Sequence, residues 1–195
     1  KEAPEKLDEL KKLLLAVRNK RIHPGLDDKI LTGWNAMMIH GLTDAYKAFG
    51  DEQFLSLALE NISFLEAFLM EDGKVYRAFK KKHSETEAFL EDYAYLIQAY
   101  TSLYQVTFNE GWLYKAENRC NYVMENFYDK EDGFLHLSSQ SAEQLIAKKK
   151  EIFDNVIPAS NSVMAHNLYT LGILLDKEVW KEQAIKMTSQ LSGLI

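Results

Sequence analysis

Two carboxylates hold the positions best suited to acid–base chemistry. Asp28 and Asp92 are each the second of two adjacent acids, and each comes just before an apolar, helix-like pattern. Two carboxyl groups in unlike surroundings can divide into a general acid and a general base or nucleophile. We therefore select Asp28 and Asp92 as the candidate catalytic pair. The alternative is structural: an ion pair of Asp28 with Lys29 or Arg21, and a helix cap for Asp92.

Polar and aromatic side chains near these acids are placed to hold a ligand. The candidate substrate-binding residues are Asp27, Lys29, Trp34, Asn35, Glu91, Tyr93, Asn161 and His166. Each type also has a structural alternative. A tryptophan on a helix face usually packs in a core, and an asparagine near a helix start caps the helix or bonds to neighbouring loops.

Two of the five histidines occupy matching places in the chain. His40 follows Asn35 by five residues, and His166 follows Asn161 by five. Imidazole titrates near neutral pH, so such a pair can act as an acid and a base; the alternative is a hydrogen-bonded structural histidine. No H-E-x-x-H or C-x-x-C spacing occurs, so we expect neither a metal site nor another cofactor.

Composition limits the partners and the compartment. The 195 residues carry a net charge of −6 with a pI near 5.4, which disfavours binding to nucleic acid or an anionic membrane. The lysine triplets 80–82 and 148–150 are expected to be solvated loop charge. Cys120 is the single cysteine, so no internal disulfide forms and we expect a cytoplasmic protein. No apolar run reaches the ~20 residues of a membrane span.

The elements that must position these residues are helices. Apolar residues recur at three- and four-residue steps, which is typical of one buried helix face. The pattern predicts helices near residues 5–18, 34–49, 54–69, 93–104, 112–127, 163–175 and 179–191. No stretch has the pattern of a long strand, so the sequence predicts an all-α protein.

The helices repeat as pairs. Phe54, Trp112 and Trp180 each follow a tight turn, and each is followed four residues later by alanine. This register favours stacked antiparallel helical hairpins over chance similarity among amphipathic helices. We expect a single domain, 1–195, with a leading helix at 1–20 and hairpin repeats at 26–80, 84–137 and 152–195.

The connections between hairpins are long, in contrast to the short turns within them. Residues 71–88 and 128–158 form these connections, and each contains a glycine followed by alternating apolar residues that predict a short β-hairpin. In stacked antiparallel hairpins all such connections emerge at one end, where binding groups usually lie. Asp28 and Asp92 are expected at this end.

Three motifs resemble signatures of a known family. They are Arg21-Ile22-His23-Pro24 followed by Asp27-Asp28-Lys29 and Trp34-Asn35, then Leu90-Glu91-Asp92-Tyr93-Ala94, and then Pro158-Ala159-Ser160-Asn161-Ser162-Val163. Their order and spacing are similar to those of the YyaL-type, spermatogenesis-associated thioredoxin-like proteins. The resemblance covers most of residues 21–175.

This resemblance implies an (α/α)6 toroid, similar to six-hairpin glycosidases and N-acylglucosamine 2-epimerase. In the family the toroid follows a thioredoxin-like domain, so we expect this chain to be an internal part of the toroid, about half of it. Glycoside hydrolysis would need two carboxyl groups about 5–5.5 Å or about 6.5–9.5 Å apart. Ala36 and Ser160 stand where the family usually has glycine. We expect this segment alone to be inactive.

The sequence therefore favours carbohydrate binding or processing, by glycoside hydrolysis or sugar epimerisation, with a sugar-like small molecule as the ligand. The alternative is a non-catalytic helical-repeat scaffold for a protein partner. A partial toroid has two apolar edges in either case, so we expect self-association through them.

Overall fold

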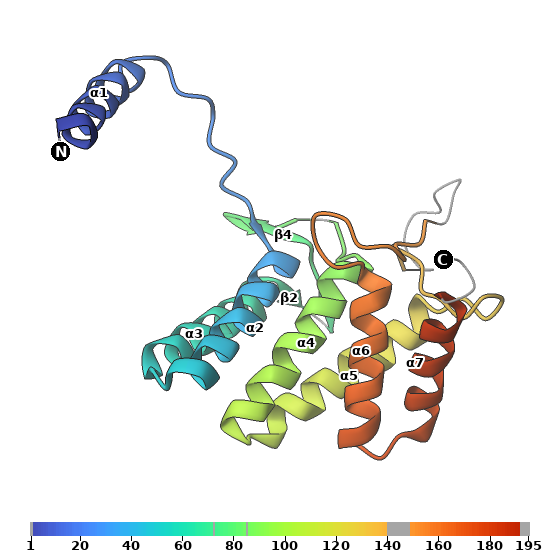
Figure 1. Cartoon of the computed structure of the whole chain (residues 1–195). Helices are drawn as coiled ribbons and strands as arrows, with labels where there is room; N and C mark the ends of the chain where they lie inside the picture. The colour runs from blue at the N-terminus through green and yellow to red at the C-terminus, as the bar shows by residue number, and fades with distance from the viewer. Residues whose placement is uncertain (1, 72, 85, 140–148, 192–195) are drawn as a thin grey trace.

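The computed structural model describes residues 2–71, 73–84, 86–139 and 149–191. Its helices are α1 (Glu2–Arg18), α2 (Thr32–Phe49), α3 (Glu52–Phe68), α4 (Leu90–Thr107), α5 (Glu110–Asn126), α6 (Ser160–Leu174) and α7 (Glu178–Leu191). Its strands are β1 (Ile30–Leu31), β2 (Met70–Glu71), β3 (Lys74–Val75), β4 (Ala78–Lys80) and β5 (Lys82–His83). The prediction of an all-α fold with short β-hairpins is confirmed (Figure 1). The outer ends of the predicted domain, residues 1 and 192–195, lie outside the described residues.

The helices from α2 to α7 form three hairpins, which stand side by side (Figure 1). α2 packs on α3, α4 on α5, and α6 on α7, while α4 also packs against both α2 and α6. The hairpins therefore have an inner row, made of α2, α4 and α6, and an outer row, made of α3, α5 and α7. The predicted stacking of hairpins is confirmed.

Short turns join the helices of each hairpin because their residues tolerate a left-handed backbone or cap the next helix. Gly50 has a φ of 68° after α2, and Asp51 accepts a hydrogen bond from the backbone N–H of Gln53 at 2.9 Å. After α4, Phe108 adopts a φ of 54°, and the side chain of Asn109 caps α5 in the same way. These caps satisfy N–H groups that have no partner within the helix.

The long connections lie at the opposite end from the turns (Figure 1). β1 pairs antiparallel with β4, and β4 pairs with β5, while β2 and β3 form a separate hairpin. The β1–β4 pairing holds the residues before α2 against the loop that follows α3. In the described part of 128–158 the strand-like contact is an isolated bridge between Tyr128 and Leu135.

The core follows α4, the middle helix of the inner row. Tyr93, Leu96 and Tyr100 are buried there, and Tyr93 stacks on Tyr122 with ring centroids 5.2 Å apart. Because α4 packs against α2, α6 and the outer helix α5, only one narrow face of α4 remains open. That face is where a ligand can meet the inner row.

The leading helix is present, but its apolar side chains are exposed. Leu10 and Leu14 on α1 remain open to solvent, because an extended linker carries α1 away from the hairpins (Figure 1). Within the described ranges, no helix is both long enough and apolar enough to span a membrane.

Candidate functional site

Asp92 ties together the first turns of two neighbouring inner helices. Its side chain is only 3% exposed. Oδ1 accepts a hydrogen bond from the backbone N–H of Gly33 at 2.9 Å, and Oδ2 accepts one from the N–H of Phe89 at 3.0 Å. The first bond joins the start of α4 to the start of α2, and the second caps α4 itself.

Arg77 reaches the same carboxylate from the loop between β3 and β4. Its Nη1 lies 3.0 Å from Oδ2 of Asp92 and 2.7 Å from Oε1 of Glu91. The guanidinium also lies 4.6 Å from the centre of the Phe89 ring. Arg77 therefore forms ion pairs with both Glu91 and Asp92.

The burial of Asp92 changes the pKa of its carboxyl group. Burial raises the pKa of Asp92 to about 6, against the lowering effects of Arg77 and of the N–H groups of Phe89 and Gly33. Both carboxylate oxygens are bonded to protein groups, so neither is open to a substrate. The geometry favours the structural alternative for Asp92.

Asp28, the other candidate acid, is half exposed and paired. Its side chain is 51% exposed and forms an ion pair with Lys80 of β4. The hydrogen bond from Lys80 holds the pKa of Asp28 below its usual value. The partner is Lys80 rather than Lys29 or Arg21, because the β1–β4 pairing brings Lys80 beside the residues that precede α2. Lys29 pairs instead with Asp27, at 3.3 Å.

Trp34 and Asn35 line an open pocket at the α2–α3 end of the row. The pocket has a volume of about 630 Å³ and is also lined by Asp27 and Lys29. Trp34 is 63% exposed, so it is not a core residue. Asn35 donates a hydrogen bond from Nδ2 to the carbonyl oxygen of Leu31 at 2.9 Å, within its own helix start.

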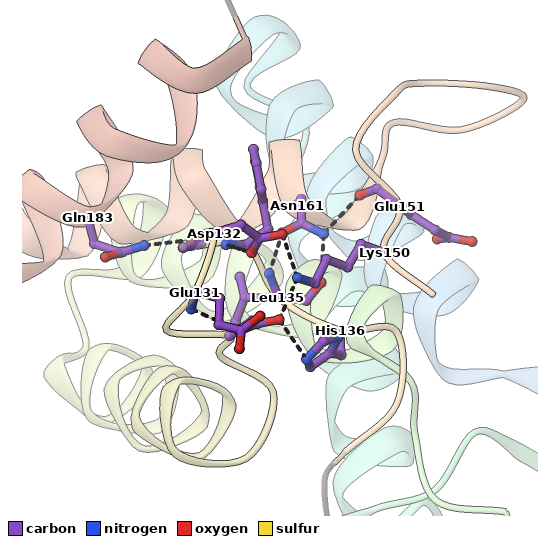
Figure 2. A network of polar contacts seen from close by, with 11 residues as sticks. Glu131, Asp132, Leu135, His136, Lys150, Glu151, Asn161 and Gln183 are labelled. Carbon is purple, nitrogen blue, oxygen red and sulfur yellow. Dashed lines mark hydrogen bonds and ion pairs between the residues drawn. The ribbon is translucent and has the colours of Figure 1, made fainter. Parts of the chain in front are cut away.

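Hydrogen bonds of the Asn161 side chain join the second long connection to the start of α6 (Figure 2). Its Oδ1 accepts a hydrogen bond from the N–H of Leu135 at 2.8 Å. Its Nδ2 donates to the carbonyl oxygens of Leu135 at 3.0 Å and of Glu151 at 2.9 Å. The side chain is buried and fully used by the loops, as the structural alternative for this asparagine required.

Lys150 forms the centre of an ion-pair network beside Asn161 (Figure 2). Its ammonium lies 2.7 Å from Oδ2 of Asp129 and 2.6 Å from Oδ2 of Asp132, and its side chain is mostly buried. The expectation of solvated charge is therefore wrong for Lys150, because its ammonium forms ion pairs with both Asp129 and Asp132. Lys148 lies outside the described residues.

A polar groove lies along the inner row. It has a volume of about 370 Å³. Its lining residues are His40 of α2, Gln98, Thr101, Ser102 and Gln105 of α4, and His166, Asn167 and Thr170 of α6. Gln98, Ser102 and Gln105 follow one another at four- and three-residue steps, so they share one face of α4. No group of three or more His, Cys, Asp or Glu side chains in the described chain could hold a metal ion.

His40 makes the central polar contact of this groove. Its Nδ1 lies 2.7 Å from Oγ of Ser102, and its Nε2 lies 3.6 Å from Oδ2 of Asp44. Burial lowers the pKa of His40, the carboxylate of Asp44 raises it, and the charges of Lys47 and then of His166 lower it further. The tertiary structure brings the two matching histidines within electrostatic reach of one another.

The candidate residues fall into separate places rather than one pocket. Asp27, Lys29, Trp34 and Asn35 lie at the α2–α3 end, Glu91 and Asp92 lie with Arg77, and Tyr93 is buried. Asn161 and His166 both line a pocket of about 380 Å³ on α6 and α7, and His166 also lines the groove. Sequence analysis missed Gln98, Ser102 and Gln105. The signal that could have identified these residues is their polar stripe on a helix that is otherwise apolar.

The fold defines the class of protein: an arc of the (α/α)6 toroid type. A GH76 α-mannanase of Bacteroides thetaiotaomicron superposes with a TM-score of 0.69 at 18% identity, over 85% of this chain and 46% of that chain. Cellobiose 2-epimerase from Bacillus thermoamylovorans superposes with a TM-score of 0.68 at 15% identity, over 86% of this chain and 46% of that chain. The expected toroid fold is confirmed.

Comparison with sequence relatives indicates a family within this class of fold. An uncharacterized protein of Caenorhabditis elegans is 30% identical over 186 residues, which are 91% of this chain and 25% of that protein. Spermatogenesis-associated protein 20 of Homo sapiens is 27% identical over 190 residues, which are 92% of this chain and 24% of that protein. No protein-family model matches the chain. The resemblance to the spermatogenesis-associated thioredoxin-like proteins is confirmed, and the chain spans about a quarter of the length of these relatives.

Proposed function

We propose that the groove along α2, α4 and α6 binds a sugar-like, polyhydroxylated small molecule. The observation that carries this proposal is the lining, in which amide, hydroxyl and imidazole groups converge from three helices. Amides and hydroxyls both donate and accept hydrogen bonds, which suits a ligand whose surface is mostly hydroxyl groups. Gln98 and Gln105 of α4 supply side-chain amides to this groove, and Oε1 of Gln105 also accepts a hydrogen bond from Lys47 at 3.3 Å.

The structural neighbours support a carbohydrate as the ligand. They include a GH76 α-mannanase and cellobiose 2-epimerase, and this chain superposes on each over about 85% of its length. Identities of 15–18% carry the fold alone, so the choice of ligand rests on the polar groove as well.

The groove favours proton transfer by histidine over glycoside hydrolysis. Hydrolysis needs two carboxyl groups that face the scissile bond. Asp92 is enclosed by its partners, and Asp28 is paired with Lys80 at the start of α2. Epimerisation needs a base to remove a proton and an acid to return it. In the full-length protein we assign the base to His40, whose pKa is lowered by burial, and the acid to His166.

Binding by the chain tests the proposal. Calorimetric titration with cellobiose, α-1,6-mannotriose and mannose should show saturable binding of at least one of these sugars. Gln98→Ala and His166→Ala should each raise the Kd about fivefold, since one lost hydrogen bond is worth about 1 kcal/mol.

The matched control is Tyr114→Ala on the outer helix α5, which should bind as the wild type does. No saturable binding of any of the three sugars, or equal affinity in all variants, contradicts the proposal. Absence of sugar binding would favour the scaffold alternative.

A further inference from the structure

Both ring nitrogens of His40 lie beside polar side chains, and the two neighbours differ in charge. Nδ1 is 2.7 Å from the hydroxyl oxygen of Ser102 on α4. Nε2 is 3.6 Å from Oδ2 of Asp44, one turn further along α2. A neutral imidazole carries its proton on one nitrogen and a lone pair on the other. The two neighbours therefore decide which nitrogen of His40 can receive a proton.

The hydroxyl of Ser102 points away from its own helix. A serine or threonine within a helix can donate to the carbonyl oxygen one turn earlier, and Thr101 does so, to Ile97 at 2.9 Å. Ser102 instead crosses to α2, and within the described residues His40 is the one hydrogen-bond partner of its side chain. Ser102 is only 3% exposed, so water has little access to this hydroxyl. A proton on Nδ1 of His40 would leave the Ser102 hydroxyl without an acceptor.

Asp44 is held beside the ring by a second set of contacts between α2 and α4. Its Oδ1 forms an ion pair with Lys47 at 3.2 Å, and Lys47 also donates to Oε1 of Gln105 at 3.3 Å. Oδ2 of Asp44 is the oxygen that faces Nε2 of His40. A carboxylate oxygen repels a lone pair and attracts an N–H group, so Asp44 favours the proton on Nε2.

The third inner helix adds one titratable group to this part of the groove. His166 of α6 lines the groove with His40. Burial lowers the pKa of His40, Asp44 opposes this, and the charges of Lys47 and His166 lower the pKa further. The lowered pKa favours the neutral ring, which is the form that has a lone pair to offer.

We propose that Asp44 and Ser102 hold the neutral His40 ring with its proton on Nε2 and its lone pair on Nδ1, so that His40 exchanges protons with a groove ligand through the Ser102 hydroxyl. The ligand in this statement rests on the proposed sugar site, whereas the state of the ring does not. Ser102 lines the groove, so its oxygen can meet a ligand hydroxyl. Ser102 is thus a further catalytic residue, and Asp44 is a positioning residue.

The proton transfer involves one bond at each partner. The O–H bond of the ligand breaks and its proton goes to Oγ of Ser102, while the proton of Ser102 goes to Nδ1 of His40. The ligand becomes an alkoxide and the ring becomes an imidazolium, and Ser102 ends as the hydroxyl that it was. Nε2 keeps its proton throughout, and the carboxylate of Asp44 stabilises the imidazolium.

Nitrogen-15 NMR of the labelled chain tests the state of the ring without a ligand. Long-range proton–nitrogen spectra, recorded above the pH at which His40 titrates, distinguish a ring nitrogen that carries a proton from one that carries a lone pair. The signals that vanish in His40→Gln belong to this ring. In the wild type the proton should be on Nε2, and Nδ1 should give the signal of a nitrogen that accepts a hydrogen bond.

Ser102→Ala and Thr101→Val form a matched pair. Each removes one hydroxyl from α4, but only the hydroxyl of Ser102 contacts His40. Ser102→Ala should move the Nδ1 signal toward that of a free lone pair, whereas Thr101→Val should leave it unchanged. Asp44→Ala should admit the other tautomer, so that the two nitrogen signals move toward each other. Circular dichroism should show the same helix content in all these proteins.

A wild-type ring with its proton on Nδ1, or equal shifts in Ser102→Ala and Thr101→Val, would overturn the proposal. For a sugar that the wild type binds, Ser102→Ala should raise the Kd about fivefold, since one hydrogen bond is lost. An unchanged Kd would overturn the contact of Ser102 with the ligand. Failure of the sugar site itself gives a different result: none of the three sugars binds, while the nitrogen signals still support the assigned tautomer of His40.

Discussion

The backbone N–H of Gly33 donates a hydrogen bond to Oδ1 of Asp92 across 2.9 Å, which joins the first turn of α2 to the first turn of α4. The approach is close: a Cβ on residue 33 would lie 2.9 Å from the same oxygen. Asp92, which the sequence motif suggested as a catalytic acid, thus joins the first hairpin to the second. The contact lies at the end of the molecule that carries the long connections.

Asp92→Ala should lower the free energy of unfolding by about 2–4 kcal/mol. The variant leaves the N–H groups of Gly33 and Phe89 without their acceptor and removes one of the two carboxylate partners of Arg77. Urea unfolding followed by circular dichroism measures the loss. Asp28→Ala is the control, with an expected loss below about 1 kcal/mol because its ion pair is exposed. Equal losses in the two variants would show that Asp92 does not join the hairpins.

Gly33→Ala should destabilise the chain by about 1–3 kcal/mol, because the added Cβ would press on the Asp92 carboxylate. Gly41→Ala, on the same helix, is the matched control. A Cβ at residue 41 would meet nothing within 4 Å, so alanine there should stabilise α2 by about 0.5–1 kcal/mol. Thermal unfolding of both variants gives opposite signs if the contact is as described. A shift of the same sign in both would argue against it.

Asp92 should titrate near pH 6 in the folded protein. Burial raises its pKa to about 6 from an ordinary 3.8, so the native state keeps a proton that the unfolded chain releases between these values. The stability that this carboxyl contributes is therefore complete below about pH 4 and is lost as the pH rises through 6, by roughly 3 kcal/mol. A carbon-13 NMR titration of the carboxyl group measures the midpoint. A midpoint at or below pH 4 would mean that Arg77 and the two N–H donors outweigh burial.

His166→Ala should raise the pKa of His40. Burial and the charge of His166 both lower that pKa, so removing the neighbouring imidazole should move it upward. A proton NMR titration of the His40 ring measures the change. His23→Ala in the exposed linker is the control and should leave the pKa of His40 as it is. No difference between the variants would place His166 outside the groove.

The helices and their pairing could be predicted from the chain because local rules govern them. The three- and four-residue steps of apolar side chains set the helix faces. Gly50 and Asp51 mark a turn through a left-handed backbone and a cap, and Asn109 repeats the cap one hairpin later. The first long connection also kept its predicted strands, since alternating residues after Gly73 suit a β-hairpin.

The candidate site could be predicted only in part, because exposure depends on what packs across each helix. Trp34 and Tyr93 both lie in the first turn of an inner helix, yet Trp34 is exposed and Tyr93 is buried, since α4 has a neighbouring inner helix on each side and α2 has one. Likewise Gln98 and Ser102 matter only because α2 and α6 bring His40 and His166 to the same groove.

The sequence by itself determined the helices, their turns and their three-fold repetition, because these follow from periodicity and from backbone conformations that few residues allow. Only the tertiary structure decided which acid is enclosed and which is open. Asp28 and Asp92 have the same side chain, but Asp92 lies where Gly33, Phe89 and Arg77 converge, while Asp28 meets one exposed lysine. The chemistry of a carboxylate depends on its solvation and its partners, and these are set by helices that lie far apart along the chain.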